Sequence, residues 1–181
     1  MFRAMQAALI APLVALALVQ ASAAIAQGQT KPPAKAEPQK LGSFTGWDAF
    51  TYTEGRNKIC YVIGRPKTSE PKGAKRGEIY LTVTHRTADK VKGEFGVYLG
   101  YPLKDKSTVD ASIGNAKFSL FSHEDSAYAM DAKSEQALTQ AMGGGQSLFV
   151  RGTSARNTAT TDTYALPGFA AALKAIDAAC K

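Results

Sequence analysis

The chain has 181 residues, 45% of them hydrophobic, and a formal net charge of +7, which is enough chain for one domain with a buried core. A modest basic excess favours acidic partners such as acidic proteins or anionic lipid headgroups. The apolar runs are too short for a membrane-spanning helix, which needs about 20 apolar residues, so the composition excludes an integral helical membrane protein.

Residues 1–26 are typical of a cleavable secretory signal. Arg3 precedes an apolar run over residues 7–19, and the small residues that follow end in Ala24-Ile25-Ala26, which matches the A-x-A cleavage pattern. We therefore expect a mature chain that begins near Gln27 and contains no transmembrane segment. The expected compartment is the periplasm, with secretion or association with the outer membrane left open.

Residues 27–43 are rich in Pro, Lys and Ala. Within them, residues 27–40 contain three prolines and no aromatic or branched aliphatic residue. Such a segment buries too little apolar surface to offset the entropy lost on ordering. We expect a disordered tether over residues 27–43 and a single β-rich domain over residues 44–181.

Alternation of apolar and polar residues dominates the chain that follows and predicts many short strands. In residues 78–86, for example, Ile79, Leu81 and Val83 fall on one face. Gly114-Asn115 is a signal for a two-residue hairpin. The expected strands cover residues 47–52, 58–64, 78–86, 94–101, 109–113, 116–121, 128–130, 147–153 and 160–166.

Two segments have the spacing of a helix. Residues 131–142 end at a run of three glycines, and residues 167–179 begin with Pro167, which suits the first helical turn. No β-α-β order recurs along the chain. The pattern predicts a mainly β fold, an antiparallel β-sandwich or barrel-like domain with two helices, the second at the C-terminus.

The chain has two cysteines, Cys60 and Cys180. An even number of cysteines in an exported chain favours a disulfide. Cys60 shares a strand face with Val62, and Cys180 continues the apolar face of the last helix. We expect a bond between them that fastens this helix to an early strand; two separate buried thiols are the alternative.

The densest basic stretch runs from Arg65 to Arg76. Binding to single-stranded nucleic acid would place stacking aromatic residues among such cations, and this stretch has none. We interpret it as a solvated hairpin loop and expect no nucleic-acid partner.

Candidate chemistry is sparse, because the chain has only two histidines, His85 and His123. His123 opens the sequence H-E-D, whose consecutive side chains point in different directions, whereas a metal site needs three or four converging ligands. The nucleophile elbow, Walker and dinucleotide-binding motifs are absent. We expect no catalytic residue, no metal and no cofactor, and a fold that needs neither histidine. A hydrolase with a dispersed Ser/His/Asp site stays open as a remote alternative.

Four segments resemble the invasion-associated locus B family: G-W-D-A-F at 46–50, K-I-C-Y-V-I at 58–63, G-Y-P-L at 100–103 and the stretch 151–169. The resemblance covers roughly residues 44–180. It implies an exported protein of alphaproteobacteria, from a family named for a role in host-cell invasion by some pathogens, and it supplies no catalytic residues. Many members carry a cysteine shortly after the early Trp; Asp48 to Tyr52 stand there instead, which indicates a divergent subgroup with two cysteines.

Tyr80, Tyr98 and Arg86 are the candidate binding residues. They point away from the apolar faces of two predicted strands that are close in sequence and expected to pair. Tyr and Arg are the side chains that most often anchor interfaces. We therefore expect a non-enzymatic interaction module whose partner is an unidentified envelope or host protein.

Two alternatives stay open, one for this surface and one for the function. A helix or a second sheet would cover the face and bury both tyrosines. An envelope structural or stress protein would instead bind cell-wall polymer or make peripheral contact with anionic lipid.

Overall fold

The structure is a computed structural model that describes residues 37–181, so the signal predicted over residues 1–26 and the first part of the predicted tether lie outside the described residues. The described chain forms strands and two helices. In chain order these are β1 (Gln39–Phe44), β2 (Trp47–Glu54), β3 (Asn57–Gly64), β4 (Thr68–Glu70), β5 (Tyr80–Arg86), β6 (Val91–Tyr98), β7 (Thr108–Ile113), β8 (Ala116–His123), β9 (Ser126–Ala129), α1 (Ala132–Gly144), β10 (Ser147–Thr153), β11 (Ala159–Ala165) and α2 (Phe169–Ala179).

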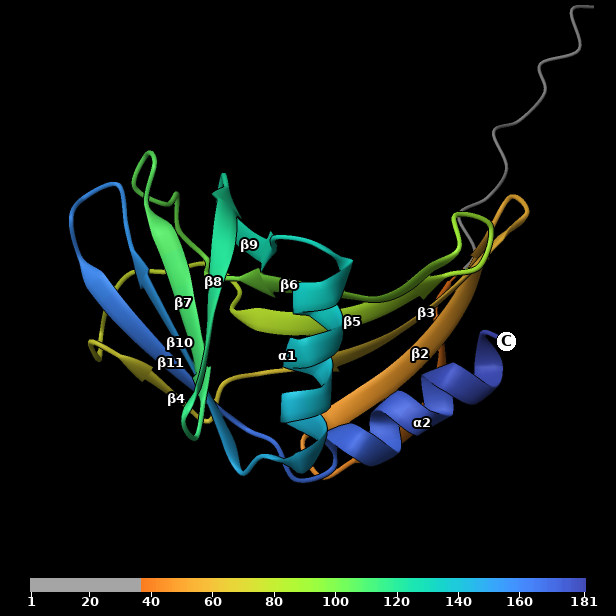
Figure 1. Ribbon diagram of the computed structural model, residues 1–181. Helices are drawn as coiled ribbons and strands as arrows, with labels where there is room; N and C mark the ends of the chain where they lie inside the picture. Colours follow the sequence, from red (N-terminus) through yellow and green to blue (C-terminus); the bar gives the residue numbers. More distant parts are fainter. Residues whose placement is uncertain (1–36) are drawn as a thin grey trace, which may run out of the picture. The chain divides into compact units, whose positions relative to one another are not determined.

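All of these strands join one antiparallel sheet in the order β1-β2-β3-β5-β6-β9-β8-β7-β10-β11-β4. The sheet bends at β9, so that β5 and β6 run across the direction of β7 and β8 (Figure 1). It stays open, with β1 and β4 as its edges. The prediction of a mainly β, antiparallel domain with two helices, the second at the C-terminus, is confirmed.

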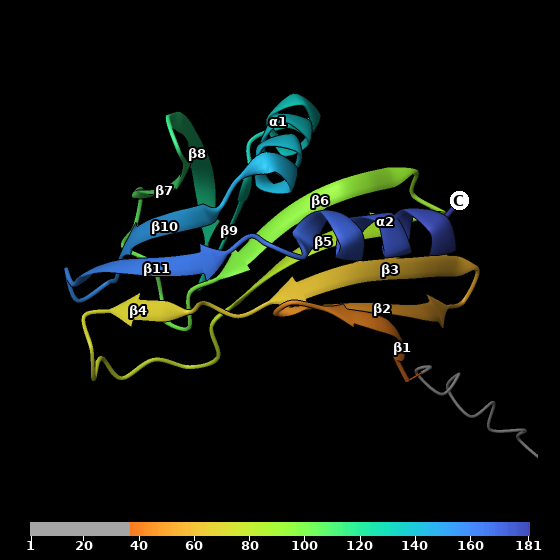
Figure 2. The ribbon, with the colours of Figure 1, turned by 90° about the horizontal axis from the view of Figure 1, so that it is seen from below.

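Both helices pack on the same face of this sheet. α1 lies beside β6, and α2 runs along β2 and β3 (Figure 2). The inward side chains of α2 include Phe169, whose ring meets the buried Trp47 edge to face with centroids 5.0 Å apart. The Trp47 ring occupies the space that a Cβ on its register partner Gly64 would fill, 2.6 Å away, so only glycine fits opposite this tryptophan. The core therefore lies between the helices and one face of the sheet.

Three local expectations need correction. Residues 39–43, expected in the tether, belong to β1, because backbone hydrogen bonds to β2 supply the stability that their polar side chains do not. β4 lies inside the basic stretch expected to be a solvated loop, and it pairs with β11. The strand expected over residues 94–101 ends at Tyr98, since Gly100 adopts a φ of +73° and turns the chain.

The expected disulfide is present between Cys60 and Cys180, with Cα atoms 6.0 Å apart. It joins β3 to the end of α2 across 120 residues of sequence. Cys60 is fully buried, so the bond fastens the C-terminal helix directly to the core.

Loss of this bond is expected to destabilise the domain. We predict that Cys180→Ser lowers the free energy of unfolding by about 2–5 kcal/mol, because the unfolded chain regains the freedom of a long closed loop. Urea unfolding of the oxidised proteins measures the difference, and the wild type under a reducing agent is the matched control, expected to unfold at the same urea concentration as the variant. Equal stability of oxidised wild type and variant would contradict the prediction.

Candidate functional site

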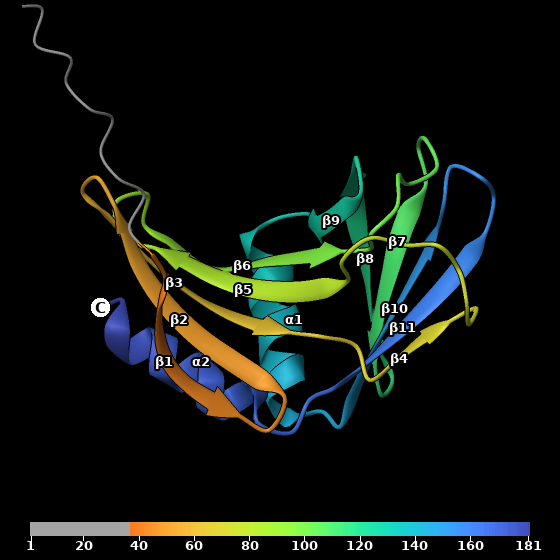
Figure 3. The same cartoon turned by 180° about the vertical axis from the view of Figure 1, so that it is seen from behind.

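Tyr80 and Tyr98 lie opposite each other on β5 and β6, and their rings stack with centroids 4.3 Å apart and planes 20° apart. Both side chains are partly exposed. Their inward neighbours Leu81 and Val97 are buried, so the tyrosines occupy the sheet face that the helices leave uncovered (Figure 3). Over residues 37–181 no helix or second sheet covers the pair, and the alternative that both rings are core residues is wrong.

Aromatic side chains continue across this face. Tyr128 on β9 lies over Gly96, where a Cβ would come 3.1 Å from its ring, and its ring lies 5.6 Å from that of Phe121 on β8. Phe121 is 44% exposed. The pKa of Tyr98 is raised, first by burial and second by the contact with the Tyr128 hydroxyl. This phenol therefore keeps its proton and can donate a hydrogen bond.

A pocket of about 630 Å³ adjoins the stacked pair, and three carboxylates line it together with Tyr80 and Tyr98. We call it the tyrosine pocket. Two of the carboxylates, Glu124 and Asp125, come from the β8–β9 turn. That turn is fixed in place, because the backbone N–H groups of residues 99 and 103 donate to the carbonyls of residues 125 and 124 at 2.9 and 2.8 Å. The third carboxylate is Glu78, which pairs at the surface with Arg65.

The chemistry of the tyrosine pocket suits a cation attached to an apolar stem. Aromatic faces attract cations, and the carboxylates add charge complementarity. A lysine or arginine side chain of a partner protein has both properties.

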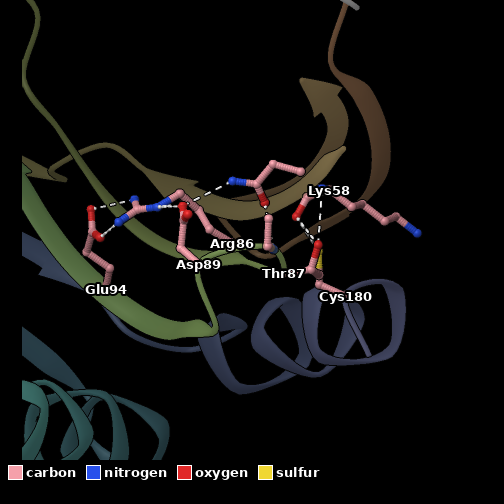
Figure 4. A network of polar contacts seen from close by, with 8 residues as sticks. Lys58, Arg86, Thr87, Asp89, Glu94 and Cys180 are labelled. Carbon is pink, nitrogen blue, oxygen red and sulfur yellow. Dashed lines mark hydrogen bonds and ion pairs between the residues drawn. The ribbon is translucent and has the colours of Figure 1, made fainter. Parts of the chain in front are cut away.

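Arg86 does not belong to this pocket. It lies at the opposite end of β5 from Tyr80, six residues away, which is about 20 Å along a strand. Its guanidinium donates to both carboxylate oxygens of Glu94, one at 2.9 Å, and to Asp89 at 3.2 Å (Figure 4). The three residues share a face of the sheet, as predicted, but Arg86 lies too far along β5 to line the pocket beside the tyrosines.

His85 is buried, with both ring nitrogens engaged. The Gly93 N–H donates to Nδ1 at 3.0 Å, so Nε2 carries the proton of the neutral ring and donates to Asp177 at 3.1 Å. His85 and Thr139 line one pocket, distinct from the tyrosine pocket, but the Thr139 hydroxyl forms no hydrogen bond with His85. A general base needs a nitrogen free to accept a proton, and this arrangement leaves none.

These contacts bind β5 to β6 and α2. The expectation that the fold needs neither histidine stays a prediction. The contacts of His85 count against it, because removal of this ring leaves the Gly93 N–H without its acceptor. His123 lies exposed at the end of β8. Within residues 37–181 no three His, Cys, Asp or Glu side chains converge to hold a metal ion. The helices of this part of the chain are too short or too polar to cross a membrane.

Sequence reasoning missed the buried ion pair between Arg76 and Asp162. Asp162 is fully buried on the inward face of β11, and the Arg76 side chain is 6% exposed. The sequence does contain a signal for this pair. Asp162 occupies every second position of β11 together with Thr160 and Tyr164, and all three are buried. A carboxylate at an inward position requires a cationic partner, and the basic stretch supplies it.

Three comparisons with known proteins place this architecture. A family model described as Invasion associated locus B (IalB) protein matches residues 47–177. Among solved structures, the crystal structure of invasion associated protein B from Bartonella henselae is similar, with a TM-score of 0.55 and 16% sequence identity over 78% of this chain and 97% of that one. At that identity the likeness shows a shared fold. A search of curated protein sequences found no match.

The Asp177 contacts predict a pH-dependent contribution to stability. Burial alone would raise the pKa of Asp177, but hydrogen bonds from Lys92 and His85 outweigh it and hold the pKa below its ordinary value of 3.8. The carboxylate therefore stabilises the fold above that pH, and its contribution is lost as the pH falls through the lower folded-state value. We predict that Asp177→Asn destabilises the domain at pH 7 and that the deficit relative to wild type shrinks at pH below 3.8.

Urea unfolding at pH 7 and at a pH below 3.8 measures the loss of stability of Asp177→Asn relative to wild type. Asp105→Asn is the control, since Asp105 is exposed and no ion pair of the described chain includes it. The control is expected to match wild type at both pH values. A deficit for Asp177→Asn that is the same in acid and at neutrality would count against the ionised pair.

Proposed function

Because the chain belongs to the invasion associated locus B family, we propose that it is an exported, non-enzymatic interaction module of the cell envelope that binds a partner protein through the tyrosine pocket. One observation carries the proposal. Two stacked tyrosines lie uncovered on a sheet face, beside three carboxylates. Tyrosines in such partly desolvated positions are the residues that most often dominate binding energy.

Export is supported by two independent features. Residues 1–26 have the pattern of a cleavable signal. The chain's two cysteines are bonded to each other, and such bonds persist in oxidising compartments. The periplasm is a compartment that fits both features and puts an envelope partner within reach, whereas a partner on a host cell would require secretion or display at the outer membrane.

A binding role accounts for the described residues better than an enzymatic one. The buried histidine has no free nitrogen, and His123 is exposed at the end of β8. The tyrosine pocket contains carboxylates and phenols but no histidine, cysteine or serine. These carboxylates and phenols are groups that can hold a basic side chain.

The partner segment is expected to present a lysine or arginine flanked by apolar side chains. The cation would lie against the tyrosine faces and pair with Glu124 and Asp125, while the apolar neighbours cover Tyr128 and Phe121. The walls of the pocket are already fixed by backbone hydrogen bonds, so binding orders few additional groups.

Photo-crosslinking tests the proposal in the native compartment. A benzophenone amino acid placed at Tyr98 is expected to capture a specific protein, identified by mass spectrometry, that the same probe at Tyr52 does not. Tyr52 is a suitable control because it lies on the same sheet face, away from the pocket, and makes an edge contact with Tyr61.

The affinity of variant proteins for the captured protein then tests whether Tyr80 and Tyr98 contribute to binding. Tyr80→Ala with Tyr98→Ala is expected to weaken binding at least about thirtyfold, the loss of roughly 2 kcal/mol typical of an interface anchor. Tyr52→Ala with Tyr61→Ala removes an equal number of rings and is expected to change binding less than about threefold. Melting temperatures establish that both variants fold. Full binding by a folded Tyr80/Tyr98 variant would refute the proposal.

A further inference from the structure

A second pocket lies on the other side of the chain segment that contains Tyr101 and Pro102, and both residues also line the tyrosine pocket. Its volume is about 420 Å³. One wall is the loop over residues 71–76, between β4 and β5, and the other is the β10–β11 hairpin over residues 154–160. We call it the basic pocket.

All the charged side chains that line the basic pocket are cationic. Lys72, Lys75 and Arg156 line it, all three are exposed, and no Asp or Glu contributes to the lining. None of the three takes part in an ion pair within the described residues. The fourth cation, Arg76, is already neutralised by Asp162, so it shapes the pocket without adding to its net charge.

The loop that carries the two lysines is held in position. Arg76 donates to the two Asp162 oxygens at 2.8 and 2.6 Å and to the Leu99 carbonyl at 2.9 Å. The next residue, Gly77, donates its N–H to the Gly100 carbonyl at 2.7 Å. Lys75 therefore extends from a fixed backbone next to a buried anchor.

The hairpin that carries Arg156 is equally constrained. Ser154 and Thr158 exchange backbone and side-chain hydrogen bonds at 2.9 and 3.1 Å, and the Ala155 N–H donates to the Pro102 carbonyl at 2.8 Å. The Ser154 hydroxyl accepts from the Thr158 N–H and keeps its own proton for donation. Both walls thus have an ordered backbone before any ligand arrives, which lowers the entropic cost of binding.

We propose that the basic pocket binds the phosphate group of an anionic ligand, either a lipid headgroup or a soluble phosphoester. Three cations that form no ion pair within residues 37–181 offer positive charge in excess of the one or two negative charges of a phosphate diester or monoester. The planar guanidinium of Arg156 offers paired donors to its oxygens, and the lysines add point charges. The site is separate from the tyrosine pocket, and either can exist without the other.

Titration of the mature protein with inorganic phosphate, followed by NMR chemical shifts, tests the site directly. We expect saturable shifts at the backbone N–H groups of residues 72–76 and 154–158. Lys72→Ala with Lys75→Ala and Arg156→Ala is expected to weaken binding at least about tenfold, a change of 1.4 kcal/mol. Arg56→Ala with Lys117→Ala and Lys133→Ala is the matched control, because it removes the same charge from exposed positions elsewhere.

Vesicles distinguish the two sources of phosphate. If vesicles of phosphatidylglycerol and phosphatidylcholine bind the wild type, vesicles of phosphatidylcholine alone do not, and inorganic phosphate competes, the ligand is a lipid headgroup. Saturable phosphate binding without vesicle binding supports a soluble phosphoester. Shifts that fail to saturate, or equal losses in the pocket and control variants, would overturn the proposal, since they would show only a general response to net charge.

Discussion

The buried ion pair between Arg76 and Asp162 fixes the region on which both candidate pockets depend. Within residues 37–181 it is the ion pair whose two side chains are both buried, at 6% and 0% exposure. Arg76 also packs over the Tyr101 ring, with its guanidinium carbon 4.9 Å from the ring centroid. A buried charge without a partner of opposite charge strongly destabilises a fold. The loop after β4 therefore has to bring Arg76 next to the buried Asp162.

The consequence of this constraint is a divided surface. Tyr101 and Pro102 separate carboxylates and tyrosines on one side from three exposed cations on the other. A net charge of +7 alone would suggest a uniformly basic surface, whereas the fold sorts the charges into two neighbouring sites of opposite sign. If both proposals hold, one small domain would bind a basic protein segment and an anionic group at neighbouring sites.

Features marked by local sequence or by the cysteine count were predictable, whereas other pairings between distant segments were not. Alternation located most strands, Gly114-Asn115 marked the β7–β8 hairpin, and the cysteine count indicated the disulfide. β4 was missed because its three residues gain their stability from β11, about 90 residues later. Nothing in the sequence set Arg76 apart from the other cations of the basic stretch, because its partner Asp162 is 86 positions away. For Arg86, alternation predicted the correct face, and the six residues that separate it from Tyr80 along β5 keep it away from the tyrosine pair.

Urea unfolding of Asp162→Asn tests most directly whether this ion pair holds the region together. The variant leaves the Arg76 charge buried without its partner, and we expect the free energy of unfolding to fall by about 3–5 kcal/mol. Glu78→Gln, which breaks the exposed pair with Arg65, is the matched comparison and is expected to cost less than about 1 kcal/mol. A loss for Asp162→Asn no larger than that for Glu78→Gln would contradict the account.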